Sequence, residues 1–146
     1  MGSYQLITST YEHLDKLEIN PVHEGEQDKE TLKRVISLDH VCAYTLVYHD
    51  DPIAILGAGL KHKGVGAGFA MMGTSIDKHK VALCRATRFL VYVIAEKLGL
   101  KRLECVVRAD SAKAKKFAEY LTFEVEGLMK SYGPTGLDYY LLARVF

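Results

Sequence analysis

The sequence has almost no excess charge of either sign and no long apolar run. It carries 19 Lys and Arg residues against 18 Asp and Glu residues, which leaves a net charge of +1. No global field therefore draws the protein onto nucleic acid, and we expect no nucleic-acid partner. The longest strongly apolar run, residues 89–95, is far too short to span a bilayer, which takes roughly 20 residues. We therefore expect no membrane-spanning helix.

Cysteine is also scarce. The three cysteines, Cys42, Cys84 and Cys105, lie far apart among apolar neighbours. This pattern predicts buried free thiols in a reducing compartment rather than a disulfide framework or a zinc site. The N-terminus has neither a basic head nor an apolar core, so we expect no secretion signal. At 146 residues the chain is long enough for one domain, residues 1–146, with a layered core.

Hydrophobic periodicity divides the chain into strands and helices. We expect strands at residues 4–8, 41–48, 53–60, one ending near 72, 102–108, 123–132 and 137–145. We expect helices from a capping box of Ser9 with Glu12, at 29–38, at 81–98 and within 111–123. Gly99 follows the long helix as a left-handed stop position. The order β-α-α-β-β-β-α-β-α-β-β predicts an α+β domain with a mixed β-sheet and helices on both faces.

Two lysine clusters stand at the starts of helices that follow strands. One contains Lys78 and Lys80, and the other contains Lys113, Lys115 and Lys116. Helix N-termini favour phosphate through free N–H groups and the helix dipole, so the two clusters suggest a groove for a polyphosphate ligand. The alternative is that both are solvated helix faces.

The order of elements resembles the GCN5-related N-acetyltransferase (GNAT) fold over nearly the whole chain. The family has a pyrophosphate loop, Q/R-x-x-G-x-G/A, upstream of the glycine that ends its central helix. Counting back from Gly99 places His79 at the Gln/Arg position, Ala82 at the first glycine and Cys84 at the last small position. The small residues agree with close backbone approach to phosphate, but the glycines themselves are absent.

A second family motif, N-x-x-A-x-x-L-Y-x-x-L-G-F, resembles residues 111–123. Ser111 takes the Asn position, and four apolar positions agree: Ala114, Phe117, Leu121 and Phe123. Ala118 replaces the Tyr that often protonates the leaving thiolate in the family. Tyr120 lies two residues further, about 200° around the helix, so it does not simply substitute.

A narrower resemblance is to the small Gp13-like GNAT proteins of short-tailed phages. The acidic N-terminal helices, the strand-turn-strand around residues 51–57 and the weakened phosphate loop are similar. Some members of that group are internal virion proteins. The likeness implies phage structural proteins as partners and a location in the host cytoplasm or the virion.

The resemblance implies a wedge between strands 67–73 and 102–108 that holds acetyl-CoA, with an amine as the second substrate. It implies these cofactor-binding residues: Met71, Met72, Gly73, Thr74, Lys78, His79, Lys80, Ala82, Ser111 and Lys115. An amine must be deprotonated before it attacks, often by Glu or His. His62, Glu104 and Glu126 are candidates by position only, so the catalytic residues are unknown.

Three functions remain open from the sequence. The first is an acetyl-CoA-dependent N-acetyltransferase with degenerate motifs. The second is a non-catalytic phage virion or assembly protein, and the third is a host-directed binding protein. A metal at His49, Asp50 and Asp51 is less favoured than a turn before Pro52, and we expect none. The oligomeric state is not indicated.

Overall fold

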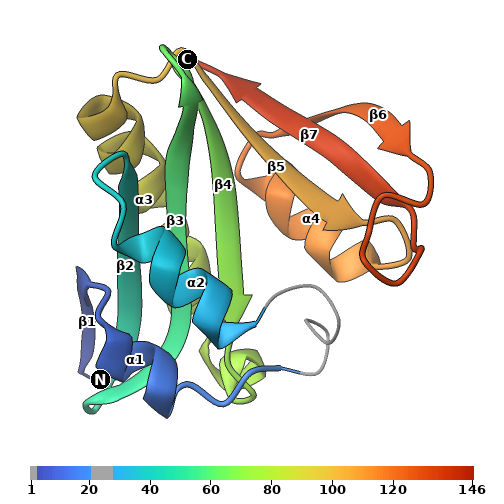
Figure 1. Cartoon of the computed structure of the whole chain (residues 1–146). Coiled ribbons are helices and arrows are strands. Elements are labelled where there is room, and N and C mark those ends of the chain that lie inside the picture. The colour runs from blue at the N-terminus through green and yellow to red at the C-terminus, as the bar shows by residue number, and fades with distance from the viewer. Residues whose placement is uncertain (1–2, 21–27) are drawn as a thin grey trace.

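One mixed sheet of seven strands carries helices on both of its faces (Figure 1). The computed structural model describes residues 3–20 and 28–146. The strands are β1 (Tyr4–Thr8), β2 (Val41–Tyr48), β3 (Asp51–His62), β4 (Val65–Met72), β5 (Arg102–Arg108), β6 (Glu124–Met129) and β7 (Tyr139–Val145). The helices are α1 (Tyr11–Lys16), α2 (Lys29–Ile36), the 3₁₀ helix η2 (Ile76–His79), α3 (Lys80–Leu98) and α4 (Ala112–Tyr120). The predicted order of elements and fold class are confirmed, with η2 added.

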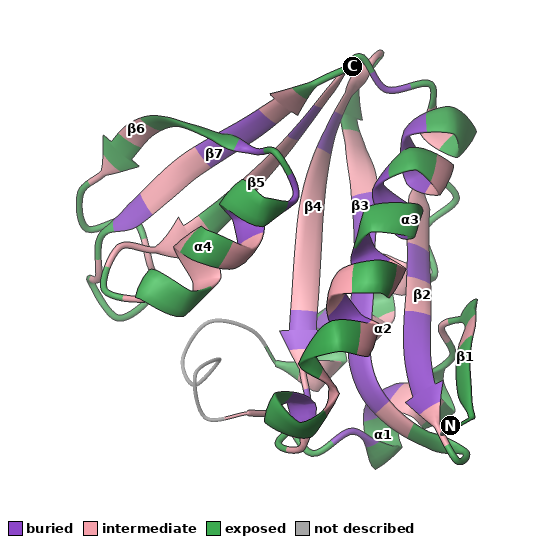
Figure 2. Cartoon of the chain, turned by 180° about the vertical axis from the view of Figure 1, so that it is seen from behind, coloured by how far each residue is buried: buried purple, intermediate pink, exposed green. Residues whose placement is uncertain are grey.

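The strand order is β1-β2-β3-β4-β5-β7-β6. Neighbouring strands are antiparallel except for β4 and β5, which run parallel and are connected by α3. Figures 1 and 2, seen together, place α1 and α2 on one face of the sheet and α3 and α4 on the other. The parallel pair at the centre of the sheet requires a crossover connection, which is the role of the long helix.

Two apolar clusters hold these layers to the sheet. The larger joins α3 and α4 to the sheet through residues that include Leu83, Leu90, Ile94 and Leu142. Each large side chain buried in this way contributes about 1.5–3 kcal/mol to folding. The smaller cluster, on the other face, consists of Leu14, Leu17, Leu32, Ile55 and Met71. Residues 53–58 of β3 are all buried because both faces of that strand are covered.

The ends of several elements differ from the sequence prediction. α3 begins at Lys80, one residue early, and ends at Leu98, and the φ of 63° at the following Gly99 confirms the left-handed stop. The first helix is capped by Thr10 and not by Ser9. The Thr10 hydroxyl accepts from the His13 N–H while the Thr10 N–H donates to His13 Nδ1. The prediction was wrong because an imidazole nitrogen serves here as the acceptor that Glu or Gln normally supplies.

Other boundaries shift by a few residues. α2 ends at Ile36, and the last two strands are shorter than predicted, so residues 130–138 form the connection between them. The three cysteines are free, but they are half-buried rather than fully buried as predicted. Among residues 3–20 and 28–146, no helix is both long and apolar enough to cross a membrane.

Candidate functional site: a wedge between two strands

The predicted fork between β4 and β5 is confirmed. The two strands pair over only three positions, Val65 with Arg102, Gly66 with Leu103 and Ala67 with Glu104. Beyond that point β4 remains paired with β3 as far as Met72, and β5 remains paired with β7 as far as Arg108. The sheet therefore divides into two halves that diverge from a short common stem, as Figure 2 shows.

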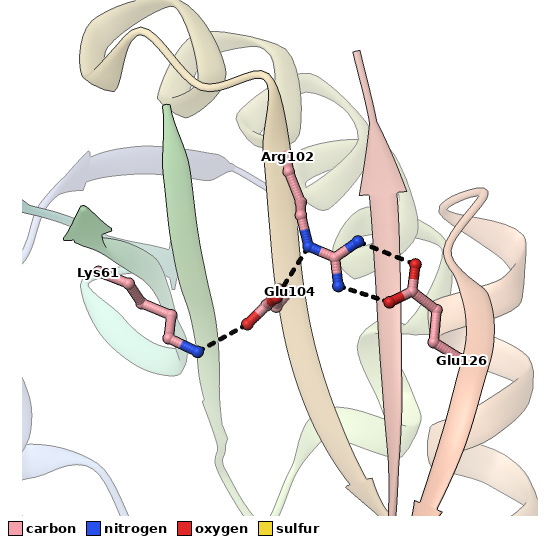
Figure 3. A network of polar contacts seen from close by, with 4 residues as sticks. All are labelled: Lys61, Arg102, Glu104 and Glu126. Atoms are coloured by element: carbon pink, nitrogen blue, oxygen red, sulfur yellow. Dashed lines mark hydrogen bonds and ion pairs between the residues drawn. The ribbon is translucent and has the colours of Figure 1, made fainter. Parts of the chain in front are cut away.

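A network of four charged side chains spans the stem of the fork (Figure 3). Lys61 Nζ lies 2.8 Å from Glu104 Oε1, and Arg102 Nε lies 2.8 Å from Glu104 Oε2. Arg102 also donates from both terminal nitrogens to the carboxylate of Glu126. We call these four residues the charge clamp. Hydrogen bonds from Lys61 and Arg102 lower the pKa of Glu104, and Arg102 lowers the pKa of Glu126.

A cavity of about 880 Å³ fills the open part of the fork. Its walls come from both halves of the sheet, from α3 and α4, and from the loop before β7. They include Gly68, Phe69, Ala70 and Met72 of β4, Cys105, Val107 and Arg108 of β5, and Leu83, Thr87 and Phe117 of the helices. Two diverging strands form the sides of the cavity, and apolar residues make up much of its lining. It suits a long ligand with apolar and amide groups.

Three of the ten predicted cofactor residues line this cavity: Met72, Lys80 and Ser111. Ser111 also caps α4 by accepting from the Ala114 N–H at 3.2 Å. Two lysines of the second cluster, Lys113 and Lys116, line the same cavity. Lysines from both α3 and α4 therefore line the same cavity.

Four of the ten predicted residues lie elsewhere. Lys78 and His79 border a separate cavity of about 460 Å³, where His79 Nδ1 and the Tyr4 hydroxyl share a hydrogen bond of 2.7 Å. Lys115 lies over the Tyr140 ring, and Met71 is fully buried on the α1–α2 face. Residues two apart in a helical turn point about 200° apart, so each lysine cluster is split between two directions.

The remaining predicted positions are Ala82, Gly73 and Thr74. Ala82 packs against the larger apolar cluster. The backbone near the end of β4 already has partners within the chain. The Gly73 N–H donates to the Ile53 carbonyl at 2.9 Å, and the Thr74 N–H donates to the Glu18 carbonyl at 2.8 Å. The carbonyl of Met72 accepts from the Asn20 N–H at 2.9 Å.

Sequence reasoning missed Asp77, which lies between the two lysine clusters. Its carboxylate is 3.7 Å from Lys80 Nζ and 3.5 Å from Lys113 Nζ. Asp77 and both lysines line the cavity, so a carboxylate lies between two of its lysines. An acidic residue directly before Lys78 is visible in the sequence. The prediction of a phosphate groove rested on the lysines alone and did not include it.

None of the three candidate bases lines the cavity. His62 lies at the end of β3 beside the stem, while Glu104 and Glu126 belong to the charge clamp. A carboxylate whose pKa is lowered by ion pairs is a weak base, so these positions do not suit proton abstraction. In the described part of the chain, no Glu or His side chain borders the cavity.

Other reactive groups near the cavity are also constrained. Burial raises the pKa of the Cys105 thiol to about 12, so this residue remains protonated and is a poor nucleophile. Ala118, which stands at the Tyr position of the second motif, is buried in the core. Tyr120 is half-exposed and lines the cavity, and its hydroxyl accepts from Arg88 Nη1 at 3.3 Å. Within the described ranges, no group of three or more metal-ligating side chains is arranged to hold an ion.

The same arrangement of strands and helices occurs in solved acetyltransferases. A candidate acetyltransferase from Acinetobacter baylyi ADP1 superposes with a TM-score of 0.81 at 12% identity, covering 100% of this chain and 94% of that one. A GNAT-family acetyltransferase from Streptococcus pneumoniae gives a TM-score of 0.75 at 15% identity, with 99% of both chains covered. The chain has the GNAT acetyltransferase fold.

RimL, a ribosomal-protein α-N-acetyltransferase solved with coenzyme A, gives a TM-score of 0.76 at 12% identity, covering 99% of this chain and 94% of that one. The sequence matches no protein-family model and no curated protein at a significant level. Identities this low establish the shared fold, while the chemistry of this chain has to be argued from its own residues.

Proposed function

We propose that the cavity between β4 and β5 binds acetyl-CoA, and that the protein is a GNAT-type N-acetyltransferase-like protein acting on an amine. The observation that carries this proposal is the fork itself. Pairing between β4 and β5 stops after three positions, and a cavity of about 880 Å³ takes the place of the missing pairing. RimL, which shares the fold, was solved with coenzyme A.

The residues present suit such a ligand in two respects. Lys80, Lys113 and Lys116 bring positive charge to the cavity from α3 and α4, which favours phosphate groups. The apolar walls of β4 and β5 suit the thinner, uncharged arm that carries the thioester.

Bound acetyl-CoA would supply an activated acyl carbon to the amine. The chain would contribute orientation and exclusion of water between the two strands, which can account for a large part of such a rate enhancement. Among the described residues, no Glu or His lines the cavity, and the Asp77 carboxylate that does line it is engaged by Lys80 and Lys113. The amine would therefore have to arrive deprotonated, so we expect slow turnover that rises with pH.

Binding is tested by calorimetry with two double variants of equal charge change. Lys80→Ala with Lys113→Ala removes cations that line the cavity, and we expect acetyl-CoA binding to weaken by about 1–3 kcal/mol. Lys78→Ala with Lys115→Ala removes one cation from η2 and one from α4 that do not line the cavity, and we expect little change. Equal losses in the two variants would contradict the assignment of the cavity.

Transfer is tested by release of free thiol from acetyl-CoA in the presence of amines. The acceptors to compare are a peptide with a free N-terminal amine, the kind of acceptor that RimL's name specifies, and a polyamine. We expect release to depend on the amine and to increase with pH. If the protein binds acetyl-CoA but no amine causes release of free thiol, it is a cofactor-binding protein and the proposal of a transferase is wrong.

A second candidate function is a non-catalytic phage virion or assembly protein with the same fold, whose partners would be phage structural proteins. The observation that favours it is that no Glu or His among the described residues lines the cavity, together with Ala118 buried in place of the family's tyrosine. Mass spectrometry of purified particles tests it. We expect the protein in the particle if this function is correct, and its absence from particles would exclude it.

A further inference from the structure

A short segment after α1 takes a place beside β4 where β5 has already diverged. Asn20 donates its backbone N–H to Met72 O at 2.9 Å, and Thr74 donates its N–H to Glu18 O at 2.8 Å. Ile19 and Gly73 form an antiparallel bridge between these two bonds. We call residues 17–20 the strap. It continues the sheet at the open end of the fork, on the edge that faces the cavity, and Asn20 lines that cavity.

The packing around Gly73 shows that the strap is closely fitted. A Cβ at position 73 would lie 2.9 Å from Leu17 Cδ1 and 2.9 Å from the Ile53 carbonyl oxygen. Such contacts are too short for a side chain, so glycine permits β4 to lie between β3 and the strap. Leu17 is 1% exposed and belongs to the smaller apolar cluster. The strap is therefore anchored at one end, while its other end is held to β4 by backbone hydrogen bonds.

The strap and an extended ligand would need the same backbone groups. A chain that lies along an open strand edge gains its affinity from main-chain hydrogen bonds. At residues 72–74 the outward carbonyl and N–H are already bonded to the strap. A ligand with amide groups can use these positions only after the strap has moved away.

We propose that the strap is a built-in competitor for the amide-bearing arm of acyl-CoA at residues 72–74 of the β4 edge. This inference rests on the proposed function, because it specifies how that same cavity is regulated. The apparent affinity of the cavity is the intrinsic affinity reduced by the fraction of molecules in which the strap is detached. Weakening the strap should therefore strengthen binding, which is the opposite of what removing an ordinary contact would do.

The test uses a matched pair of variants at one position. Asn20→Pro removes the N–H that bonds to Met72, whereas Asn20→Ala keeps that N–H and removes only the side chain. By calorimetry with acetyl-CoA, we expect Asn20→Pro to bind about three- to tenfold more tightly than Asn20→Ala, the amount expected from one backbone hydrogen bond. Equal affinity of the two variants and the wild type would overturn the proposal.

Amide hydrogen exchange of the wild-type protein gives a second measurement that needs no variant to fold. We expect the Asn20 amide to exchange faster at saturating acetyl-CoA than in its absence, because the ligand displaces its partner. Continued protection of Asn20 in the bound state would overturn the proposal. Failure of the proposed function gives a different pattern, because neither the wild type nor Asn20→Pro then binds acetyl-CoA. In that case the strap has no ligand to exclude. Binding by Asn20→Pro alone would support the strap most strongly.

Discussion

The two halves of the sheet are covered differently. In the half formed by β1 to β4, helices lie on both faces, and residues 53–58 of β3 form an unbroken buried run. In the half formed by β5, β7 and β6, α4 covers one face only, and Val106, Val125 and Leu128 of this half are exposed to between 40% and 48%. Figure 2 shows the contrast in burial along the strands. A continuous apolar strand thus indicates two covered faces, and an alternating strand indicates one.

The largest expected effect comes from matched glycine substitutions in the two halves. A Cβ on Gly57 of β3 would clash with the Cys42 carbonyl oxygen and lie 3.0 Å from Ala43 Cα, both backbone atoms. At Gly127 of β6 a Cβ would meet no atom within 4 Å. We expect Gly57→Ala to lower the free energy of unfolding by about 3 kcal/mol and Gly127→Ala to change it by less than about 1 kcal/mol. Urea unfolding of both variants measures this, and equal losses would contradict the difference in packing.

A smaller effect is expected where the halves join. Glu104→Gln removes charge-assisted bonds to Lys61 and Arg102, and we expect a loss of about 1–2 kcal/mol in the free energy of unfolding. Because these bonds lower the pKa of Glu104 below its ordinary 4.5, its stabilisation is present above pH 4.5. It is lost as pH falls through the lower pKa of the folded state. Unfolding curves between pH 7 and pH 3 should converge for the two proteins, and a constant difference would contradict the charge clamp.

The smallest effect concerns His13 of α1, a helix that covers the half of the sheet formed by β1 to β4. Burial lowers its pKa from 6.5, and its Nδ1 accepts from the Thr10 N–H at 3.1 Å. Below pH 6.5 the unfolded chain takes up a proton that the folded chain resists, so stability falls as pH falls through this window. We expect a small loss of stability over this window, which His13→Gln should not show, since an amide does not titrate. Identical pH profiles for the two proteins would refute this account of the cap.

Local patterns predicted the fold well because they report burial directly. The strand over residues 102–108 and the stop at Gly99 follow from alternation and from a backbone preference, and both are observed. The lysine clusters predicted the general location of the cavity but not its lining, because side-chain direction depends on where η2 ends and α3 begins. The strap could not be predicted, since its hydrogen bonds join backbone groups distant in sequence and leave no side-chain signal.

The central claim is that the fork between β4 and β5 accommodates an acyl-CoA molecule. An NMR titration of the isotope-labelled protein with acetyl-CoA tests it residue by residue. We predict the largest backbone shifts at Gly68 and Ala70 on β4 and at Val107 on β5, which line the cavity, and none at Gln5 on the far edge strand. Saturable shifts confined to the surroundings of Tyr4 and His79, or no shifts at all, would contradict the claim.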